Sequence, residues 1–183
     1  MYCEDNMGTD IDHFWPKSKF PERAFSWDNH LLACSHCNSN EKRECFPLGI
    51  DGRPLLLDPT AEDPREHLIF IPSNGEFEAR GLRGEATIMV FGLNDDSKPR
   101  ALPLGRRRAL NAMMALLRDY DRQAAQQDPE AEITRGNLIA YPFSSVLVWI
   151  LATAARPNPE LVLGADICAI LTRHRVADWI SDV

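Results

Sequence analysis

The spacing of apolar side chains predicts helices in the second half of the chain. From residue 104 to about residue 127, apolar residues recur every three or four positions, which is the period of an amphipathic helix. Two more helices are expected at residues 144–156 and 158–183. The break between them lies at Pro157 and Pro159, because proline removes a backbone donor and interrupts a helix.

Shorter patterns in the middle of the chain predict strands. Residues 68–71 and 76–80 flank a Ser-Asn-Gly sequence at 73–75, and Asn-Gly readily adopts the positive φ angles of a hairpin turn. A third strand is expected at residues 86–91. These strands would form a small sheet that precedes the helices.

The first 48 residues are rich in turns and cannot bury a core alone, so they need a metal or a supporting body. We therefore predict an α+β protein with two parts. Residues 1–48 form a small N-terminal finger, and residues 49–183 form a body that changes from mixed α/β to mainly helical.

Composition and charge limit the function classes. Of the 183 residues, 44% are hydrophobic and 26% charged, which is ordinary for a globular protein. No apolar run reaches the roughly 18 residues of a membrane span and no secretory signal opens the chain, so a cytoplasmic protein without membrane contact is expected. The net charge of −7 argues against tight binding of nucleic acid by this chain alone, because phosphate neutralisation supplies most nonspecific affinity.

The cysteines indicate a metal site rather than disulfides. Four of the five cysteines fall within the first 45 residues, and Cys34 and Cys37 have C-x-x-C spacing, which in a cytosolic chain is typical of metal binding. With Cys3 they are predicted to form a structural Zn²⁺ site, since thiolates suit this ion. Cys168 lies in an apolar helical segment and is expected to be a core residue.

Polar residues suited to phosphodiester cleavage lie in three segments of the first 48 residues. The segments are residues 10–13 (DIDH), 29–32 (NHLL) and 34–42 (CSHCNSNEK). Each alone has a simple structural explanation, such as a turn or a solvated charge, but the ordered combination is far more specific. It resembles the HNH nuclease motif, in which a β-hairpin crossed by a helix forms a ββα-metal site.

The resemblance implies a role for each motif residue. His13 would be the general base, because a neutral imidazole suits that task near pH 7. Asp12 and Asn38 would bind Mg²⁺ or Mn²⁺ through oxygen atoms. Asn29 would orient His13 by a hydrogen bond across the loop, and Lys42 would contact the substrate phosphate. No such role is expected for Asp10, His30 and His36.

The zinc knuckle departs from the family pattern. That pattern has two cysteines before the strand that carries Asp12 and His13. This chain has only Cys3 there, and the position of the first cysteine of the pair falls just before Met1. A sequence that begins inside the knuckle is therefore expected. Cys45 is an alternative fourth ligand, although its sequence context does not fit a paired knuckle.

The resemblance extends over roughly the first hundred residues, to the retron- and Septu-associated HNH nucleases of bacterial anti-phage defence. The similar segments are residues 2–4 (YCE), 12–22 (DHFWPKSKFPE), 25–29 (FSWDN), 46–48 (FPL), 56–59 (LLDP), 63–68 (DPREHL) and 92–94 (GLN). Asp12 stands where this family often has Glu.

Membership of that family would imply a nuclease effector with DNA as the expected substrate and an ABC- or SMC-like ATPase as partner subunit. The aromatic residues Phe14, Trp15, Phe20 and Trp27 are expected to pack around the finger rather than to stack on bases.

Two alternatives remain at this point. A noncatalytic zinc-finger module that binds nucleic acid or protein would need the cysteines but not Asp12 or His13, and would normally be basic. A free-standing HNH nuclease or toxin would act without an ATPase.

Overall fold

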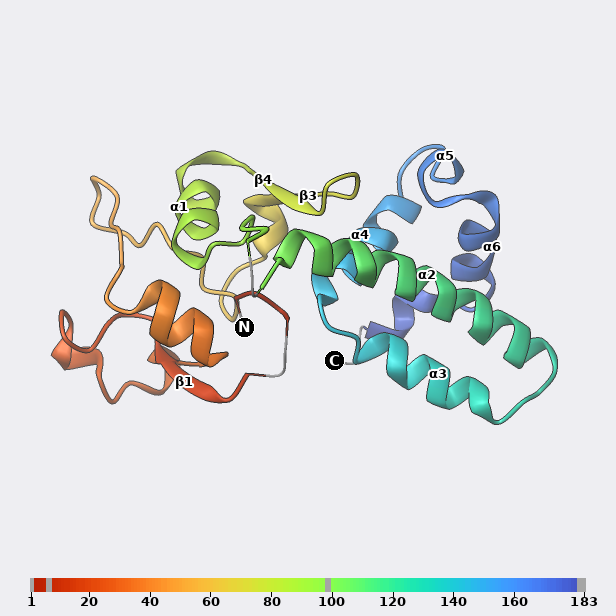
Figure 1. Cartoon of the computed structure of the whole chain (residues 1–183), viewed down its shortest axis with the longest axis horizontal. Helices are drawn as coiled ribbons and strands as arrows, with labels where there is room; N and C mark the ends of the chain where they lie inside the picture. Colours follow the sequence, from red (N-terminus) through yellow and green to blue (C-terminus); the bar gives the residue numbers. More distant parts are fainter. Residues whose placement is uncertain (1, 6–7, 98–99, 181–183) are drawn as a thin grey trace. The chain divides into compact units, whose positions relative to one another are not determined.

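The computed structural model describes residues 2–5, 8–97 and 100–180, and the chain divides into two compact units, residues 1–105 and 106–183. The first unit contains two β-hairpins and one α-helix, and the second is helical (Figure 1). The α+β class and the helical C-terminal body are therefore confirmed. The boundary expected after residue 48 falls inside the first unit.

A β-hairpin and a short helix form the N-terminal part of the first unit. Strand β1 (Asp10–His13) pairs antiparallel with β2 (His30–Ala33), so that His13 lies opposite His30. The connection contains two 3-10 turns, η1 (Pro21–Arg23) and η2 (Trp27–Asn29). The helix that follows β2 is η3 (His36–Lys42), a π-helix that packs against β1. This is the hairpin crossed by a helix that the motif predicts.

The second hairpin also agrees with the sequence pattern. Strands β3 (Leu68–Ile71) and β4 (Glu76–Ala79) pair antiparallel on either side of the turn that contains residues 73–75. The 3-10 turn η4 (Pro64–Glu66) precedes β3, and the side chain of Asp63 caps it by accepting a hydrogen bond from the N–H of Arg65.

The strand predicted at residues 86–91 is wrong, because this segment belongs to helix α1 (Gly81–Phe91). The buried residues Gly84, Thr87 and Phe91 recur at helical spacing, a pattern that is visible only when Gly84 is included. Gly92 ends the helix in the left-handed conformation, with φ of 56°, as a C-terminal glycine commonly does. Packing of α1 against β4 and η3 outweighs the β-propensity of its apolar residues.

A close approach between α1 and the second hairpin requires glycine at position 84. A Cβ atom there would lie 2.3 Å from the carbonyl oxygen of His67 and 3.2 Å from the Cα of Ala79. Both are backbone atoms, so the helix could accept a larger residue only by moving away from the hairpin.

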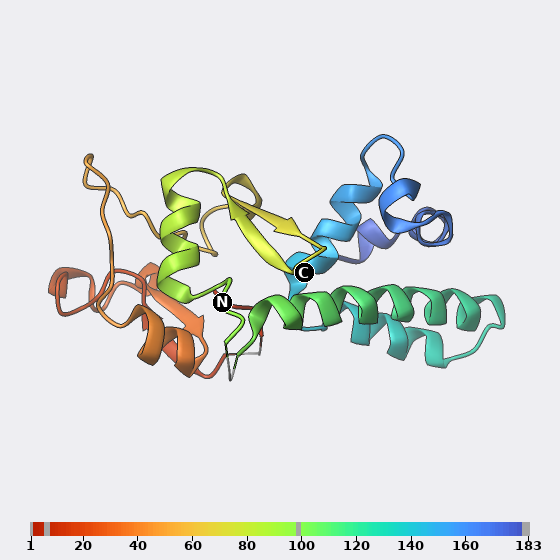
Figure 2. The same cartoon turned by 45° about the horizontal axis from the view of Figure 1, so that its top comes forward.

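The second unit is built from one long helix and several shorter ones around a buried apolar core. Helix α2 (Leu102–Ala125) crosses the division between the units, and α3 (Glu130–Ile139) runs back beside it (Figures 1 and 2). The remaining helices are α4 (Ser144–Ala154), α5 (Glu160–Leu163), α6 (Ala165–Arg173) and the 3-10 helix η5 (Val176–Ile180). Fully buried side chains from successive helices include Leu117, Leu138, Ile150, Ile167 and Val176.

Three expectations for this unit need correction. Helix α3 was not predicted, because its sequence EAEITRGNLI has few apolar residues to reveal a helical face. The single helix expected at 158–183 is interrupted at Gly164, whose φ of 86° is not helical. Cys168 is partly exposed on α6 rather than a core residue.

Among the described residues, no single helix has both the length and the apolar character needed to cross a membrane. Helices α3 and α4 meet those criteria only as a pair, and they are bent by 101° at their junction.

Gly84→Ala should destabilise the protein by about 2 kcal/mol or more, because the new methyl group collides with backbone atoms. The matched control is Gly136→Ala in α3, where a Cβ would meet nothing within 4 Å. That change should stabilise by about 0.5–1 kcal/mol, since alanine restricts the unfolded chain and favours helix. Urea denaturation of both variants would measure this difference. Equal effects of the two substitutions would contradict the packing described here.

Candidate functional site

A buried ion pair joins β1 to the π-helix. The Nζ of Lys42 donates to Asp12 Oδ1 at 2.9 Å and to the carbonyl oxygen of His13 at 2.6 Å. The other carboxylate oxygen, Asp12 Oδ2, accepts a hydrogen bond of 2.7 Å from the hydroxyl of Tyr2. Lys42 is fully buried and Asp12 is 2% exposed, so both charges depend on each other and on these hydrogen bonds.

Burial and charge act in opposite directions on the lysine. Burial lowers the pKa of Lys42 below its ordinary value, while the Asp12 carboxylate raises that pKa. Burial, and then the Asp12 charge, raise the pKa of Tyr2 well above its usual value. Tyr2 therefore remains a hydroxyl that donates to Asp12.

This arrangement corrects the role expected for Lys42. A substrate phosphate cannot reach an ammonium group that is fully buried and hydrogen-bonded to Asp12 and His13. Sequence spacing alone does not distinguish this buried lysine from a solvent-facing one. Tyr2, which completes the cluster by stacking on Phe91 with ring centroids 3.8 Å apart, was not identified from the sequence as a residue of the site.

His13 points toward the β1–β2 loop. Its Nε2 lies 3.1 Å from the carbonyl oxygen of Ala24. A carbonyl oxygen can only accept, so Nε2 carries the hydrogen, and in the neutral ring Nδ1 is then the basic nitrogen. The ring also packs edge-on against His30, with centroids 4.7 Å apart. The structure thus fixes the tautomer of His13 through the loop backbone.

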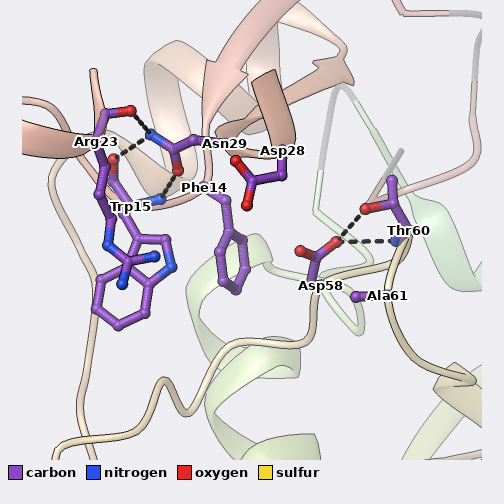
Figure 3. Close-up of a pocket in the computed structure, with 8 residues that line it drawn as sticks. All are labelled: Phe14, Trp15, Arg23, Asp28, Asn29, Asp58, Thr60 and Ala61. Carbon is purple, nitrogen blue, oxygen red and sulfur yellow. Dashed lines mark hydrogen bonds between the residues drawn. The ribbon is translucent and has the colours of Figure 1, made fainter. Parts of the chain in front are cut away.

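Asn29 holds that loop rather than the imidazole of His13. Its Oδ1 accepts from the N–H of Trp15 at 2.7 Å, and its Nδ2 donates to the carbonyl oxygens of Trp15 and Arg23 at 3.1 and 3.0 Å (Figure 3). The motif predicts a direct hydrogen bond from Asn29 to His13, but Asn29 contacts the backbone of the loop instead. Arg23 immediately precedes Ala24, the residue that accepts from His13, so Asn29 positions His13 through the backbone.

The fourth motif residue, Asn38, lies beside Asp10. Its Nδ2 is 3.5 Å from Asp10 Oδ2. Asp10 and Asp12 share one face of β1, because strand side chains alternate, and this face is turned toward η3. The sequence predicts no catalytic or metal-binding role for Asp10. Period-two alternation is the sequence signal that places it on the same face as Asp12.

A hollow of about 330 Å³ opens beside the β1–β2 loop (Figure 3). The guanidinium of Arg23 covers the ring of Trp15 at 4.3 Å from its centroid, and Asp58 accepts two hydrogen bonds from Thr60. The residues that line the hollow are Phe14, Trp15, Arg23, Asp28, Asn29, Asp58, Thr60 and Ala61.

The aromatic residues of this region behave differently from one another. Phe14, Trp15 and Phe20 pack around Phe46, with ring centroids between 4.8 and 5.7 Å from its ring, as expected. The prediction that Trp27 packs in the same way is wrong, because its side chain is 88% exposed. It lies on η2.

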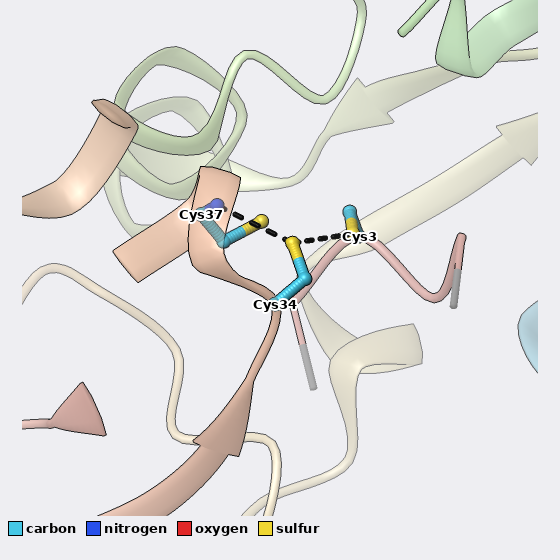
Figure 4. A group of neighbouring side chains, drawn as sticks. All are labelled: Cys3, Cys34 and Cys37. Atoms are coloured by element: carbon cyan, nitrogen blue, oxygen red, sulfur yellow. Dashed lines mark hydrogen bonds between the residues drawn. The ribbon is translucent and has the colours of Figure 1, made fainter. Parts of the chain in front are cut away.

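Three buried thiols converge where the N-terminal segment meets the start of η3 (Figure 4). The sulfur atoms of Cys3, Cys34 and Cys37 all lie within 4.8 Å of one another, and those of Cys3 and Cys34 are 3.6 Å apart. When a metal ion is coordinated tetrahedrally by cysteine sulfur atoms at about 2.3 Å, the sulfur atoms lie about 3.8 Å from one another. The cluster could therefore hold a metal ion, whereas Cys45 is exposed and lies outside it.

The surroundings of the thiols favour negative charge at Cys3 and disfavour it at Cys37. Hydrogen bonding from Cys37 lowers the pKa of Cys3, helped by the backbone at Asp5 and the nearby Arg100. The same hydrogen bond raises the pKa of Cys37, and burial adds to this effect. Arg100 approaches from far along the chain and places Nη2 3.4 Å from the sulfur of Cys37.

Cys34→Ser should remove the bound metal and destabilise the first unit, because one of the converging thiolates is lost. The matched control is Cys45→Ser, which should keep the metal. Elemental analysis of the purified variants would measure the metal content per chain, with about one ion expected for the parent. Loss of the ion in Cys45→Ser, with retention in Cys34→Ser, would contradict the assignment of ligands.

Comparison with known proteins agrees with the motif. Residues 1–44 match the family model described as HNH endonuclease. The chain is 30% identical over 123 residues to the Septu protein PtuB of Bacillus mycoides (strain KBAB4), a match that covers 51% of this chain and 42% of the relative. It is 25% identical over 99 residues to the Septu protein PtuB of Bacillus thuringiensis, covering 51% and 36%.

These matches span less than half the length of the two relatives. No solved structure matches the chain closely enough to establish a relationship. The two relatives support the Septu part of the resemblance, and neither carries a name that supports the retron part. The chain is thus similar to HNH endonucleases over residues 1–44 and distantly similar to Septu proteins PtuB over about half of its length.

Proposed function

We propose that this chain is the nuclease subunit of a Septu-type anti-phage defence complex and that it hydrolyses phosphodiester bonds, with DNA as its substrate. The observation that carries the proposal is the position of Asp12 and His13 at the end of β1, in a hairpin crossed by η3. These residues lie within the segment that matches the HNH endonuclease model. In this proposal the protein acts in the cytoplasm, where invading DNA is exposed.

His13 is the general base of the proposed reaction. Its Nε2–H donates to Ala24, which leaves Nδ1 free to take a proton from the attacking water. Asn29 keeps the loop in place, so the imidazole does not have to be ordered when substrate arrives. This preorganisation makes Asn29 a positioning residue.

We propose that a hard divalent cation, Mg²⁺ or Mn²⁺, binds on the face of β1 that carries Asp12. Asn38 and Asp12 would supply oxygen ligands, and Asp10 offers a further carboxylate beside Asn38. A carboxylate has about four lone-pair sites, of which Lys42 and Tyr2 use two at Asp12, so acceptor capacity remains. When bound, the ion would stabilise the charge that develops on the phosphate and the leaving oxygen.

We propose Zn²⁺ as the ion of the three-thiol cluster. Soft thiolates suit this ion, and the 3.6 Å separation of two sulfurs is close to the tetrahedral value. Three thiolates around a divalent ion leave one surplus negative charge. Arg100, in contact with Cys37, offsets that charge.

We propose a partner subunit, and the distribution of charge supports it. Residues 1–105 contain 18 acidic and 11 basic residues, so the unit with the proposed site is itself acidic. Such a surface gains little from counterion release on binding DNA. An ABC- or SMC-like ATPase subunit, as the family resemblance implies, would hold the DNA for this nuclease.

His13→Ala should lower DNA cleavage by about 10²–10⁴-fold, because no neighbouring group replaces the general base. The matched control is His30→Ala, which removes the ring packed against His13 and should retain most activity. Cleavage would be measured with Mg²⁺ or Mn²⁺ in the presence of the cognate partner, together with thermal unfolding of each variant. Full activity of a folded His13→Ala variant would refute the nuclease assignment and favour a noncatalytic zinc-finger module.

A further inference from the structure

Two aromatic side chains on the β1–β2 loop receive almost no cover from the rest of the described protein. Phe25 is 97% exposed and Trp27 is 88% exposed. They are separated only by Ser26. Single exposed apolar residues are common, but two nearly bare aromatic rings within three residues have no role in the packing of the finger.

The backbone that carries these rings is well ordered by hydrogen bonds. The N–H groups of Ala24 and Ser26 donate to Pro21 and Arg23, and that of Asn29 donates to Ser26. The buried side chain of Asn29 also holds the carbonyl oxygen of Arg23. The exposure of the rings is therefore a fixed feature of the loop and not a consequence of a loose segment.

The same loop is directly joined to the proposed general base. The carbonyl oxygen of Ala24, the residue before Phe25, accepts the hydrogen bond from His13. The loop between the strands, residues 14–29, contains three basic residues, Lys17, Lys19 and Arg23, and two acidic ones, so it carries a small net positive charge in an acidic chain. Lys17 and Arg23 are exposed, so local charge favours a polyanion over a basic or neutral partner.

We propose that Phe25 and Trp27 form a platform on which unpaired bases of a single strand stack, and that this platform holds the strand beside His13. The proposal rests on the proposed function for the class of ligand. Base stacking on aromatic rings is tolerant of sequence, because every base has a π-face. Bases within a duplex have their faces covered by their neighbours, so this platform favours single-stranded or locally opened DNA.

Trp15, which lies on the same loop, is not part of the platform because its ring is already covered. The guanidinium of Arg23 already covers the ring of Trp15, and Phe20 and Phe46 pack against it. Its faces are used within the finger. Phe25 and Trp27 have no comparable cover, so a base could approach them without rearrangement of the loop.

The test measures binding separately from cleavage. The chain with His13→Ala would be titrated with a fluorescent oligothymidylate single strand and with a duplex of equal length, at low salt, and fluorescence anisotropy would report affinity. Phe25→Ala and Trp27→Ala should each weaken single-strand binding by roughly tenfold or more, and the double variant should weaken it further. Trp27→Phe should restore most of the affinity, because an aromatic ring is retained.

The matched control is Ile50→Ala, which removes an equally exposed apolar side chain elsewhere in the first unit and should leave affinity unchanged. Duplex binding should change little in all variants. Undetectable single-strand binding by the parent would overturn the platform, as would unchanged binding by the double variant, the result expected if a protein partner covers these rings. If the platform variants lose affinity but the wild-type complex does not cleave, the platform stands and the nuclease proposal falls.

Discussion

The buried contact between Lys42 and Asp12 is the constraint on which the geometry of the finger depends. Lys42 lies on the π-helix and binds the carboxylate of Asp12 and the carbonyl oxygen of His13. It therefore holds both Asp12 and His13 in place. Strand side chains alternate, so with Asp12 turned inward to this contact, His13 is directed to the other side. There it meets the carbonyl oxygen of Ala24, which determines the nitrogen that remains basic.

The finger has too small an apolar core to keep this geometry alone, and distant segments supply the rest. Cys3 joins the N-terminal segment to the junction of β2 and η3 through the thiol cluster. Arg100 reaches Cys37 and Glu41 from beyond α1, and Phe91 of α1 stacks on Tyr2. These contacts explain why the first compact unit extends to residue 105 instead of ending near residue 48.

The sequence was most informative where function restricts both residue type and spacing. Such patterns predict the first hairpin, the helix after it and the thiol cluster. The turn at residues 73–75 follows from the conformational preference of Asn-Gly. The prediction of a strand at helix α1 is wrong because the buried face of this helix includes Gly84, which has no side chain to mark it and which packs closely against His67 and Ala79. Spacing also could not show that Lys42 is buried or that Trp27 is exposed. Both properties result from how segments pack after the local elements have formed.

A double-mutant cycle on Asp12 and Lys42 would test the central constraint most directly. Asp12→Leu and Lys42→Met should each lower the free energy of unfolding by about 3–5 kcal/mol, because each leaves a buried charge without its partner. The double variant should recover most of that loss and yet remain inactive, since it lacks the proposed metal ligand. For comparison, Arg118→Met, at an exposed ion pair with Asp166, should cost less than about 1 kcal/mol. Small, additive effects at Asp12 and Lys42 would contradict the role assigned to this pair.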